Sequence, residues 1–177
     1  MELELGTMTD GGNPVAAIIA ANLGSAERSL RTTATQVRLL RMAVALHRGQ
    51  EIAPLADEAE VLRVHQPAYL QQIKDARPAK GFVQLDADTW MVSETYEAAM
   101  RAVGGTNAAV DAVLADAAKN AFVAMRPPGH HAERDKPMGF CLFGTVAIAA
   151  QRALDHHGLS RVAVLDFDVH HGNGTQD

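Results

Sequence analysis

Ionisable residues gather in one short stretch near the end of the 177-residue sequence. An apolar run at residues 162–165 leads directly into Asp166, Asp168, His170 and His171. Because side chains two apart on an extended segment project the same way, Asp168 and His170 could bind one ion together. A carboxylate oxygen with an imidazole nitrogen suits zinc or another first-row metal better than calcium or magnesium. The alternative is a capped turn with solvated acids, and the clustering of four ionisable groups favours the metal site.

Two predicted strands and a helix would position this cluster beside a pair of histidines. Residues 162–167 predict a strand buried on both faces of a parallel sheet, and the apolar run at residues 121–125 predicts a second strand. An Ala-rich helix is predicted between them, at residues 140–157. Such a crossover places both carboxyl ends at one edge of the sheet. His130 and His131 are therefore expected near the cluster, where they could serve as general base and general acid in a metal-assisted hydrolase.

The rest of the chain predicts further helices from apolar residues at helical spacing. These are residues 31–47, a short helix capped by Asp57, a helix opened by Pro67, and a helix from the cap Ser93 to about Ala117. The Gly104–Gly105 pair inside the last helix indicates close packing against a neighbour. Residues 15–21 fit either a strand or a helix, and residues 76–92 predict a long surface loop, a kind of segment that is often functional.

Composition limits the class of protein. A chain that is 47% apolar can build one core, so we expect a single domain over residues 1–177, with residues 1–30 as a poorly defined N-terminal segment. The net charge of -5 argues against a nucleic-acid partner. The apolar stretch at residues 14–21 is too short to span a bilayer, so no membrane partner is expected. The single cysteine, Cys141, fits a reducing compartment, and we expect a cytoplasmic protein in which it is a buried hydrophobe.

Three motifs resemble, in the right order, those of the zinc-dependent histone deacetylase superfamily. They are RPPGHHA at residues 126–132, MGFCLF at residues 138–143 and DFDVHHGNGTQ at residues 166–176. The resemblance is strongest with class II-like bacterial deacetylases and acetylpolyamine amidohydrolases. It implies an α/β fold of the three-layer αβα arginase–deacetylase type with a mainly parallel sheet. The implied substrate is an acetylated lysine or an acetylated polyamine.

The resemblance also implies a role for individual residues. Asp168 and His170 would be two of three zinc ligands. His130 would face the metal-bound water with Asp166 behind it, and His131 would be backed by Asn173.

Further implied roles concern the substrate and a second ion. Gly139 and Phe140 would line the narrow tunnel for the acetylated chain, and Asp86 would be the carboxylate at its rim. Asp166 and Asp168 would also help to coordinate a structural potassium ion.

The chain departs from the family pattern in one main respect. The third zinc-binding aspartate and the catalytic tyrosine of relatives lie downstream of Asp177. We therefore expect a C-terminally incomplete domain that is inactive alone. An arginase-like binuclear manganese hydrolase and a non-catalytic binding protein stay open as alternatives, and the oligomeric state is also open.

Overall fold

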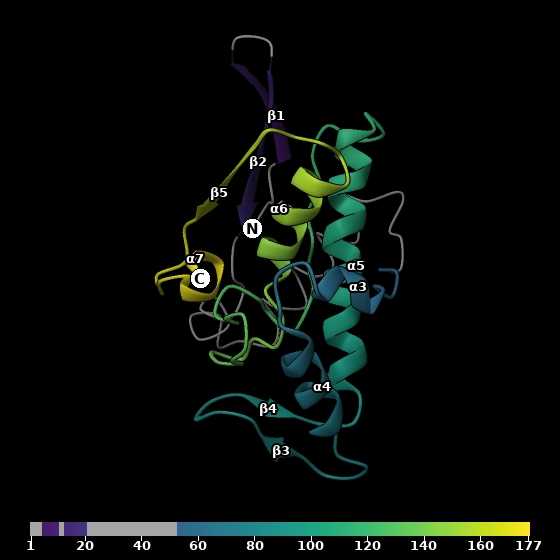
Figure 1. Cartoon of the computed structure of the whole chain (residues 1–177), viewed down its shortest axis with the longest axis vertical. Helices are drawn as coiled ribbons and strands as arrows, with labels where there is room; N and C mark the ends of the chain where they lie inside the picture. The colour runs from purple at the N-terminus through teal and green to yellow at the C-terminus, as the bar shows by residue number, and fades with distance from the viewer. Residues whose placement is uncertain (1–4, 11–12, 21–52) are drawn as a thin grey trace, which may run out of the picture.

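The computed structural model describes residues 53–177 in full, and before them the backbone of two strands, β1 (Leu5–Asp10) and β2 (Asn13–Ala20) (Figure 1). The predicted helix at residues 31–47 lies outside the described residues. The remaining helices are α3 (Glu58–Val61), α4 (Pro67–Asp75), α5 (Thr95–Leu114), α6 (Thr145–Asp155) and α7 (Asn173–Gln176). The remaining strands are β3 (Val83–Gln84), β4 (Trp90–Met91) and β5 (Arg161–Asp166). None of the helices in the described part of the chain is long and apolar enough to cross a membrane.

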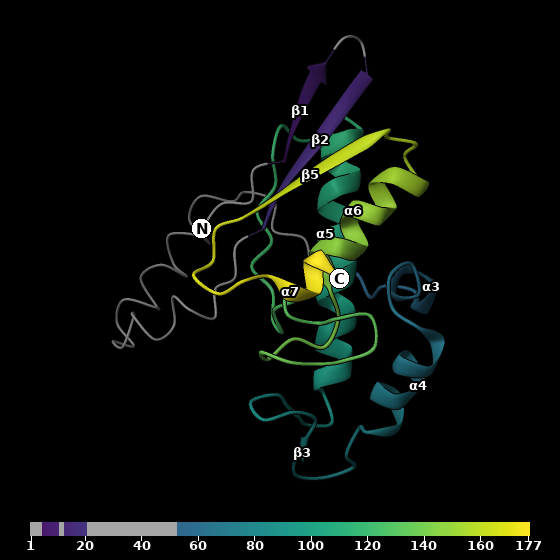
Figure 2. The same cartoon turned by 60° about the vertical axis from the view of Figure 1, so that its left-hand side comes forward.

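A three-stranded sheet in the order β1-β2-β5 carries the segment that the sequence singled out (Figure 2). Strands β1 and β2 form an antiparallel hairpin, and β2 pairs with β5 in parallel from Val15↔Arg161 to Ala20↔Asp166. The stretch at residues 15–21, which fitted either a strand or a helix, is therefore a strand through Ala20.

The predicted strand at residues 121–125 is wrong, because these residues have no regular structure. Their side chains pack along α5 instead. A Cβ atom built on Gly105 would lie 3.7 Å from Met125 Cγ and 3.9 Å from Val123 Cγ1. The preceding residue, Gly104, has no room for a Cβ atom beside the backbone of Pro54, which confirms that the glycine pair packs closely.

Strand β5 is covered on one face within the described part of the chain. Val162 and Val164 pack against a buried cluster from α5 and α6, formed by Val110, Val113, Val146, Ala149 and Ala153. The opposite face is exposed, and Leu165 on it is 61% accessible to solvent. The prediction of burial on both faces is therefore wrong here, since the described helices α5 and α6 pack against only one of them.

The helix starts follow the sequence signals in part. The Asp57 side chain accepts a hydrogen bond from Ala59 N at 3.1 Å, and Pro67 is the first residue of α4, so both predicted starts are confirmed. Ser93 is not the cap of α5, because Glu94 occupies that position without a side-chain hydrogen bond.

The helix predicted from residue 140 begins only at Thr145. Residues 138–141 form a tight turn closed by a bridge between Met138 and Cys141, and Phe140 has a φ of 67°. A left-handed residue cannot lie inside a right-handed helix, so the helix starts after this turn.

The predicted surface loop at residues 76–92 contains a short hairpin, in which Val83 pairs with Met91 and Gln84 with Trp90. The hairpin projects at the far end of the molecule from β1 and β2 (Figure 1). Exposed Phe82 and Trp90 meet edge to face on it, with ring centroids 5.2 Å apart.

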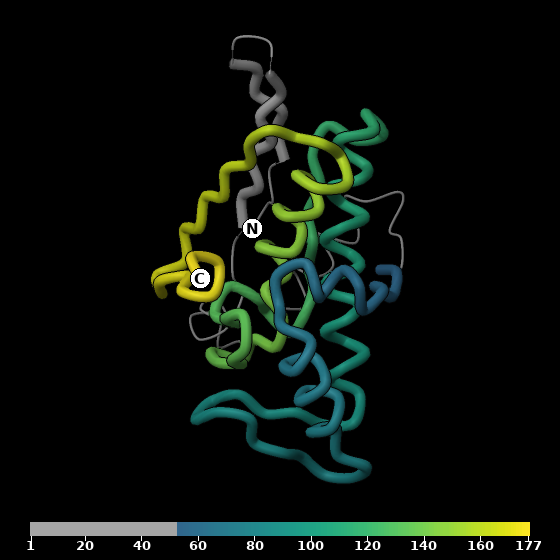
Figure 3. The backbone as a smooth tube through the Cα atoms, viewed as in Figure 1, coloured from purple at the N-terminus to yellow at the C-terminus, as the bar shows by residue number. Residues whose placement is uncertain are grey.

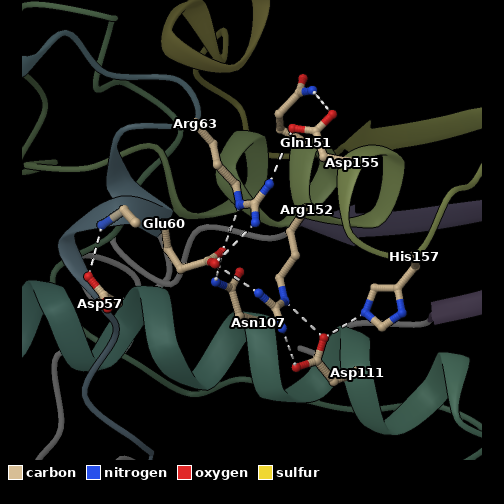
Figure 4. Close-up of polar contacts among 10 residues, drawn as sticks. Asp57, Glu60, Arg63, Asn107, Asp111, Gln151, Arg152, Asp155 and His157 are labelled. Carbon is tan, nitrogen blue, oxygen red and sulfur yellow. Dashed lines mark hydrogen bonds and ion pairs between the residues drawn. The ribbon is translucent and has the colours of Figure 1, made fainter.

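A network of charged side chains joins α3, α5 and α6 (Figure 4). Arg152 of α6 donates to Glu60 Oε1 at 2.8 Å and to Asp111 Oδ1 at 2.9 Å. The hydrogen bond from Arg63 lowers the pKa of Glu60 below its usual 4.5, with the charge of Arg152 in support and partial burial acting against them. The network fixes the helices on which the covered face of β5 packs.

Candidate active site

The histidine pair lies against the segment that follows β5. The backbone N–H groups of Gly174 and Thr175 both donate to the His130 carbonyl oxygen, at 2.9 and 3.2 Å. Figure 3 shows the resulting arrangement, with the α7 turn beside the loop that carries His130 and His131. The structure thus brings together the residues that the predicted topology was expected to bring together. It does so through direct hydrogen bonds and not through a neighbouring strand at residues 121–125.

The first histidine forms a dyad with a carboxylate. His130 Nδ1 lies 2.8 Å from Asp166 Oδ2, and the two side chains are 4% and 19% exposed. The other oxygen of Asp166 accepts from Asp168 N at 3.1 Å, which holds the carboxylate in place. Since an ionised carboxylate only accepts hydrogen bonds, the ring proton of neutral His130 is on Nδ1 and the lone pair is on Nε2.

The second histidine forms a dyad with an amide. His131 Nδ1 lies 2.7 Å from Asn173 Oδ1, and the His131 ring centroid is 4.0 Å from that of His130. The same tautomer follows for His131 if the oxygen of the amide faces it. This pair of dyads could hold and move protons next to a bound substrate.

Asp168 and His170 also lie together, as their spacing predicted. His170 Nδ1 is 2.9 Å from Asp168 Oδ1, and the His170 ring centroid is 6.0 Å from that of His131. The Asp168 side chain is 0% exposed, whereas that of His170 is 48% exposed. Among the residues that the structure describes, no group of three or more His, Cys, Asp or Glu side chains is arranged to hold a metal ion. The pair supplies one carboxylate and one imidazole, a donor set that fits part of a zinc site.

One of the two residues predicted to line the substrate tunnel, Gly139, packs against the His131 ring. Gly139 has a φ of +57°, and a Cβ atom there would collide with the His131 ring, so only glycine fits. Phe140 is 43% exposed, and its N–H donates to Thr89 Oγ1 at 3.1 Å.

Sequence reasoning missed the acidic side chain that contacts this turn. Asp88 Oδ1 accepts from Gly139 N at 3.0 Å, whereas Asp86 forms a backbone turn with Thr89. A cavity of about 530 Å³ lies between Asp88, Trp90, Arg126 and Phe140, with other residues completing its wall. A contact across 51 positions has no local signal, so the sequence alone could not separate Asp88 from Asp86.

Cys141 is a packing residue, as predicted. It is 0% exposed, and burial raises the pKa of its thiol to about 12. Its sulfur accepts from His131 N at 3.5 Å and donates to the Gly139 carbonyl oxygen at 3.3 Å. A thiol so far from ionisation is not a nucleophile at neutral pH.

Comparison with known proteins finds the family that the three motifs resemble. Residues 25–177 match the histone deacetylase domain. The chain is 48% identical over 124 residues to the histone deacetylase-like amidohydrolase of Pseudomonas aeruginosa, covering 70% of this chain and 32% of that protein. It is 38% identical over 156 residues to the polyamine deacetylase HDAC10 of Homo sapiens, covering 85% of this chain and 23% of that protein.

A solved structure gives the same answer for the fold. The crystal structure of the HDA15 HD domain superposes with a TM-score of 0.66 at 33% identity, covering 70% of this chain and 35% of that one. The predicted α/β deacetylase fold is therefore confirmed. The chain spans about a third of the length of that structure and of the bacterial relative.

Proposed function

Because the chain belongs to the histone deacetylase domain family, we propose that it carries the proton-transfer histidines and part of the zinc site of an acetyl amidohydrolase. One observation supports this most strongly. Adjacent His130 and His131 each have Nδ1 held by a side-chain oxygen, at 2.8 Å from Asp166 at the end of β5 and at 2.7 Å from Asn173 after it. The substrate class is an acetylated lysine or an acetylated polyamine, since the relatives include both a histone deacetylase-like amidohydrolase and a polyamine deacetylase.

The two histidines take different parts of the proton transfer. The Asp166 carboxylate stabilises a positive imidazolium on His130, so His130 takes the proton of the attacking water and passes it to the leaving amine. His131 has a neutral amide as its partner and stays neutral. It orients the attacking water by accepting a hydrogen bond on Nε2.

Asp168 and His170 would hold the zinc ion. The Asp168 side chain is fully buried, and its Oδ1 accepts from His170 N at 2.8 Å and lies 2.9 Å from His170 Nδ1, so a carboxylate oxygen and an imidazole nitrogen lie together as two potential ligands. When bound, zinc supplies a Lewis acid that polarises the acetyl carbonyl and acidifies water. A structural potassium ion on Asp166 and Asp168 belongs to the same proposal.

The substrate would approach along Gly139 and Phe140, with a rim carboxylate from the β3–β4 hairpin. Asp86 is the predicted rim residue, and Asp88 joins it as a candidate because its side chain contacts Gly139. We propose a cytoplasmic location on the basis of the composition.

The metal assignment is tested by replacing its buried carboxylate. In the form continued through the downstream reading frame, Asp168→Ala should lose stoichiometric zinc, as measured by elemental analysis, while the circular dichroism spectrum stays that of a folded protein. Asp155→Ala, at an exposed carboxylate of α6, is the control and should keep its zinc. Retained zinc in Asp168→Ala would refute the ligand assignment, and two manganese ions per chain would favour the arginase-like alternative.

The activity is tested by acetate release from an acetyl-lysine peptide and from an acetylpolyamine. We propose that the 177-residue chain with added zinc is inactive, and that a form continued through the downstream reading frame is active. Comparable turnover by both would remove the proposal that further ligands are needed. Substrate binding without turnover in the longer form would favour the non-catalytic alternative.

A further inference from the structure

The two ends of an amide side chain look alike in shape but differ in hydrogen bonding. A carboxylate behind a histidine accepts at both of its oxygens, whereas an amide accepts at oxygen and donates at nitrogen. If the Asn173 side-chain amide were flipped, its NH₂ group would face His131 Nδ1, and the ring proton would have to move to Nε2. The tautomer of His131 therefore depends on whatever fixes the direction of the Asn173 amide.

Three acceptors surround the nitrogen end of that amide. Asn173 Nδ2 lies 2.8 Å from Glu133 Oε1, 3.2 Å from the Met138 sulfur and 3.4 Å from the His131 carbonyl oxygen. The thioether is a weak acceptor and the carbonyl contact is long, so the short bond to the Glu133 carboxylate dominates. None of the three can donate to an amide oxygen when Glu133 is ionised.

We propose that Glu133 is a positioning residue that locks the Asn173 amide and thereby keeps His131 as the Nδ1–H tautomer. The order of contacts is Glu133 to Asn173 Nδ2, then Asn173 Oδ1 to His131 Nδ1 at 2.7 Å. Glu133 is half-buried, and its own N–H donates to the Lys136 carbonyl oxygen at 3.0 Å, which fixes its backbone in the loop beside Asn173. The inference rests on the proposed function for its catalytic meaning, since it concerns the histidine that orients water there.

The test reads the tautomer directly and needs no turnover. Long-range ¹H–¹⁵N spectra of the histidine rings distinguish Nδ1–H from Nε2–H imidazole in the 177-residue chain. We expect His131 to be a single Nδ1–H species in the unchanged chain. In Glu133→Ala the Nε2–H tautomer should become populated, because the amide is released. In the Glu133→Ala, Asn173→Asp double variant the single Nδ1–H species should return, because both oxygens of a carboxylate accept.

Two controls separate this role from a general structural one. Met138→Leu removes the weaker acceptor and should leave the tautomer unchanged, and a tautomer released by that variant would overturn the proposal. A single Nδ1–H species in folded Glu133→Ala would also overturn it.

If Glu133→Ala does not fold, the thermal unfolding midpoint of a Glu133→Gln variant is measured instead. That change should lower the midpoint or leave it unchanged when Asn173 is present and raise it in the Asn173→Asp background, where it removes a pair of facing carboxylates. Effects of the same sign in both backgrounds would contradict the proposal.

The result is independent of the proposed deacetylase activity. If the longer form turned over no acetylated substrate, the proposed function would fail, yet the tautomer measurements would still support or reject the lock on Asn173. Conversely, turnover with an unlocked His131 would leave the function standing and remove the role of Glu133.

Discussion

The two histidine dyads of the site share one geometry and differ in charge. His130 and His131 are neighbours in sequence, and each presents Nδ1 to an oxygen less than 3 Å away. Asp166 gives His130 a negative partner that accepts from either oxygen, so its direction needs no further control. Asn173 gives His131 a neutral partner that accepts only at its amide oxygen, so contacts with the surrounding loop must fix the orientation of that amide. Under the proposed function, the first dyad carries charge and the second holds an orientation.

The largest expected effect comes from removing the charged dyad. His130→Ala should reduce turnover of acetyl-lysine by about 10²-fold or more in the active longer form, the usual scale for losing a general base. Zinc content measured by elemental analysis should not change, because Asp168 and His170 remain. His131→Ala is the matched comparison, and we expect a smaller loss from it. Near-normal turnover in His130→Ala would transfer the proton-transfer role to His131 and reverse the comparison.

A glycine beside the charged dyad offers a second way to break it. A Cβ atom on Gly172 would collide with Asp166 Oδ2 and lie 3.3 Å from His130 Nδ1. Gly172→Ala should therefore push Asp166 from His130 and destabilise the fold by about 1–3 kcal/mol, the usual cost of overpacking. Denaturant unfolding measures the loss, and the His130 ring resonances report the broken contact.

Gly144 provides a close control for that substitution. Its backbone angles of φ −75° and ψ 71° nearly equal the −77° and 65° of Gly172, and both residues precede a helix. A Cβ atom on Gly144 would find its nearest atom at 3.4 Å, which is ordinary contact. Gly144→Ala should thus cost much less, and equal losses in the two variants would mean that backbone conformation, not the dyad, sets the cost.

The sequence predicted the members of both dyads but not how the chain brings them together. Family motifs paired His130 with Asp166 and His131 with Asn173, and the structure places each pair within hydrogen-bonding distance. The predicted strand at residues 121–125 failed because a short apolar run fits a strand and a packed irregular segment equally well. Nothing in the run itself shows that Val123 and Met125 pack beside Gly105 of α5.

Long-range polar contacts were also beyond the sequence. Nothing local shows that Glu133 meets Asn173 or that Asp88 meets Gly139, since each pair is separated by 40 positions or more. The left-handed conformation of Phe140 is equally hidden, because such a conformation is uncommon outside glycine, and it displaced the predicted start of α6 to Thr145. Residue types show which groups can do chemistry, whereas their direction depends on neighbours that only the fold supplies.

The smallest expected effect concerns a third histidine, which sharpens the contrast with the two dyads. His65 is 3% exposed, and backbone groups use both of its ring nitrogens. Nε2 accepts from Gly144 N at 2.9 Å, so Nδ1 carries the proton and donates to the Arg134 carbonyl oxygen at 3.2 Å. A ring bonded in this way is neutral and structural, and it joins the start of α6 to the loop after the histidine pair.

Burial lowers the pKa of His65 below 6.5, while hydrogen bonds to backbone carbonyls act in the opposite direction. The unfolded chain therefore binds a proton at a higher pH than the folded chain does. Its contribution to stability is complete above pH 6.5 and is lost as the pH falls below that value through the folded pKa. The acidic residues of the charged network titrate lower, since the pKa of Glu60 lies below 4.5 and that of Asp111 below 3.8, so their losses begin at more acidic pH.

The midpoint of thermal unfolding should fall between pH 7.5 and pH 5, because these two values lie on either side of the ordinary histidine pKa of about 6.5. His65→Gln can accept from Gly144 and donate to Arg134 without titrating, so its midpoint should be flatter over the same range. An equal decline in His65→Gln would show that His65 is not the source of the pH dependence, and its burial would then have no measurable effect on stability in this range.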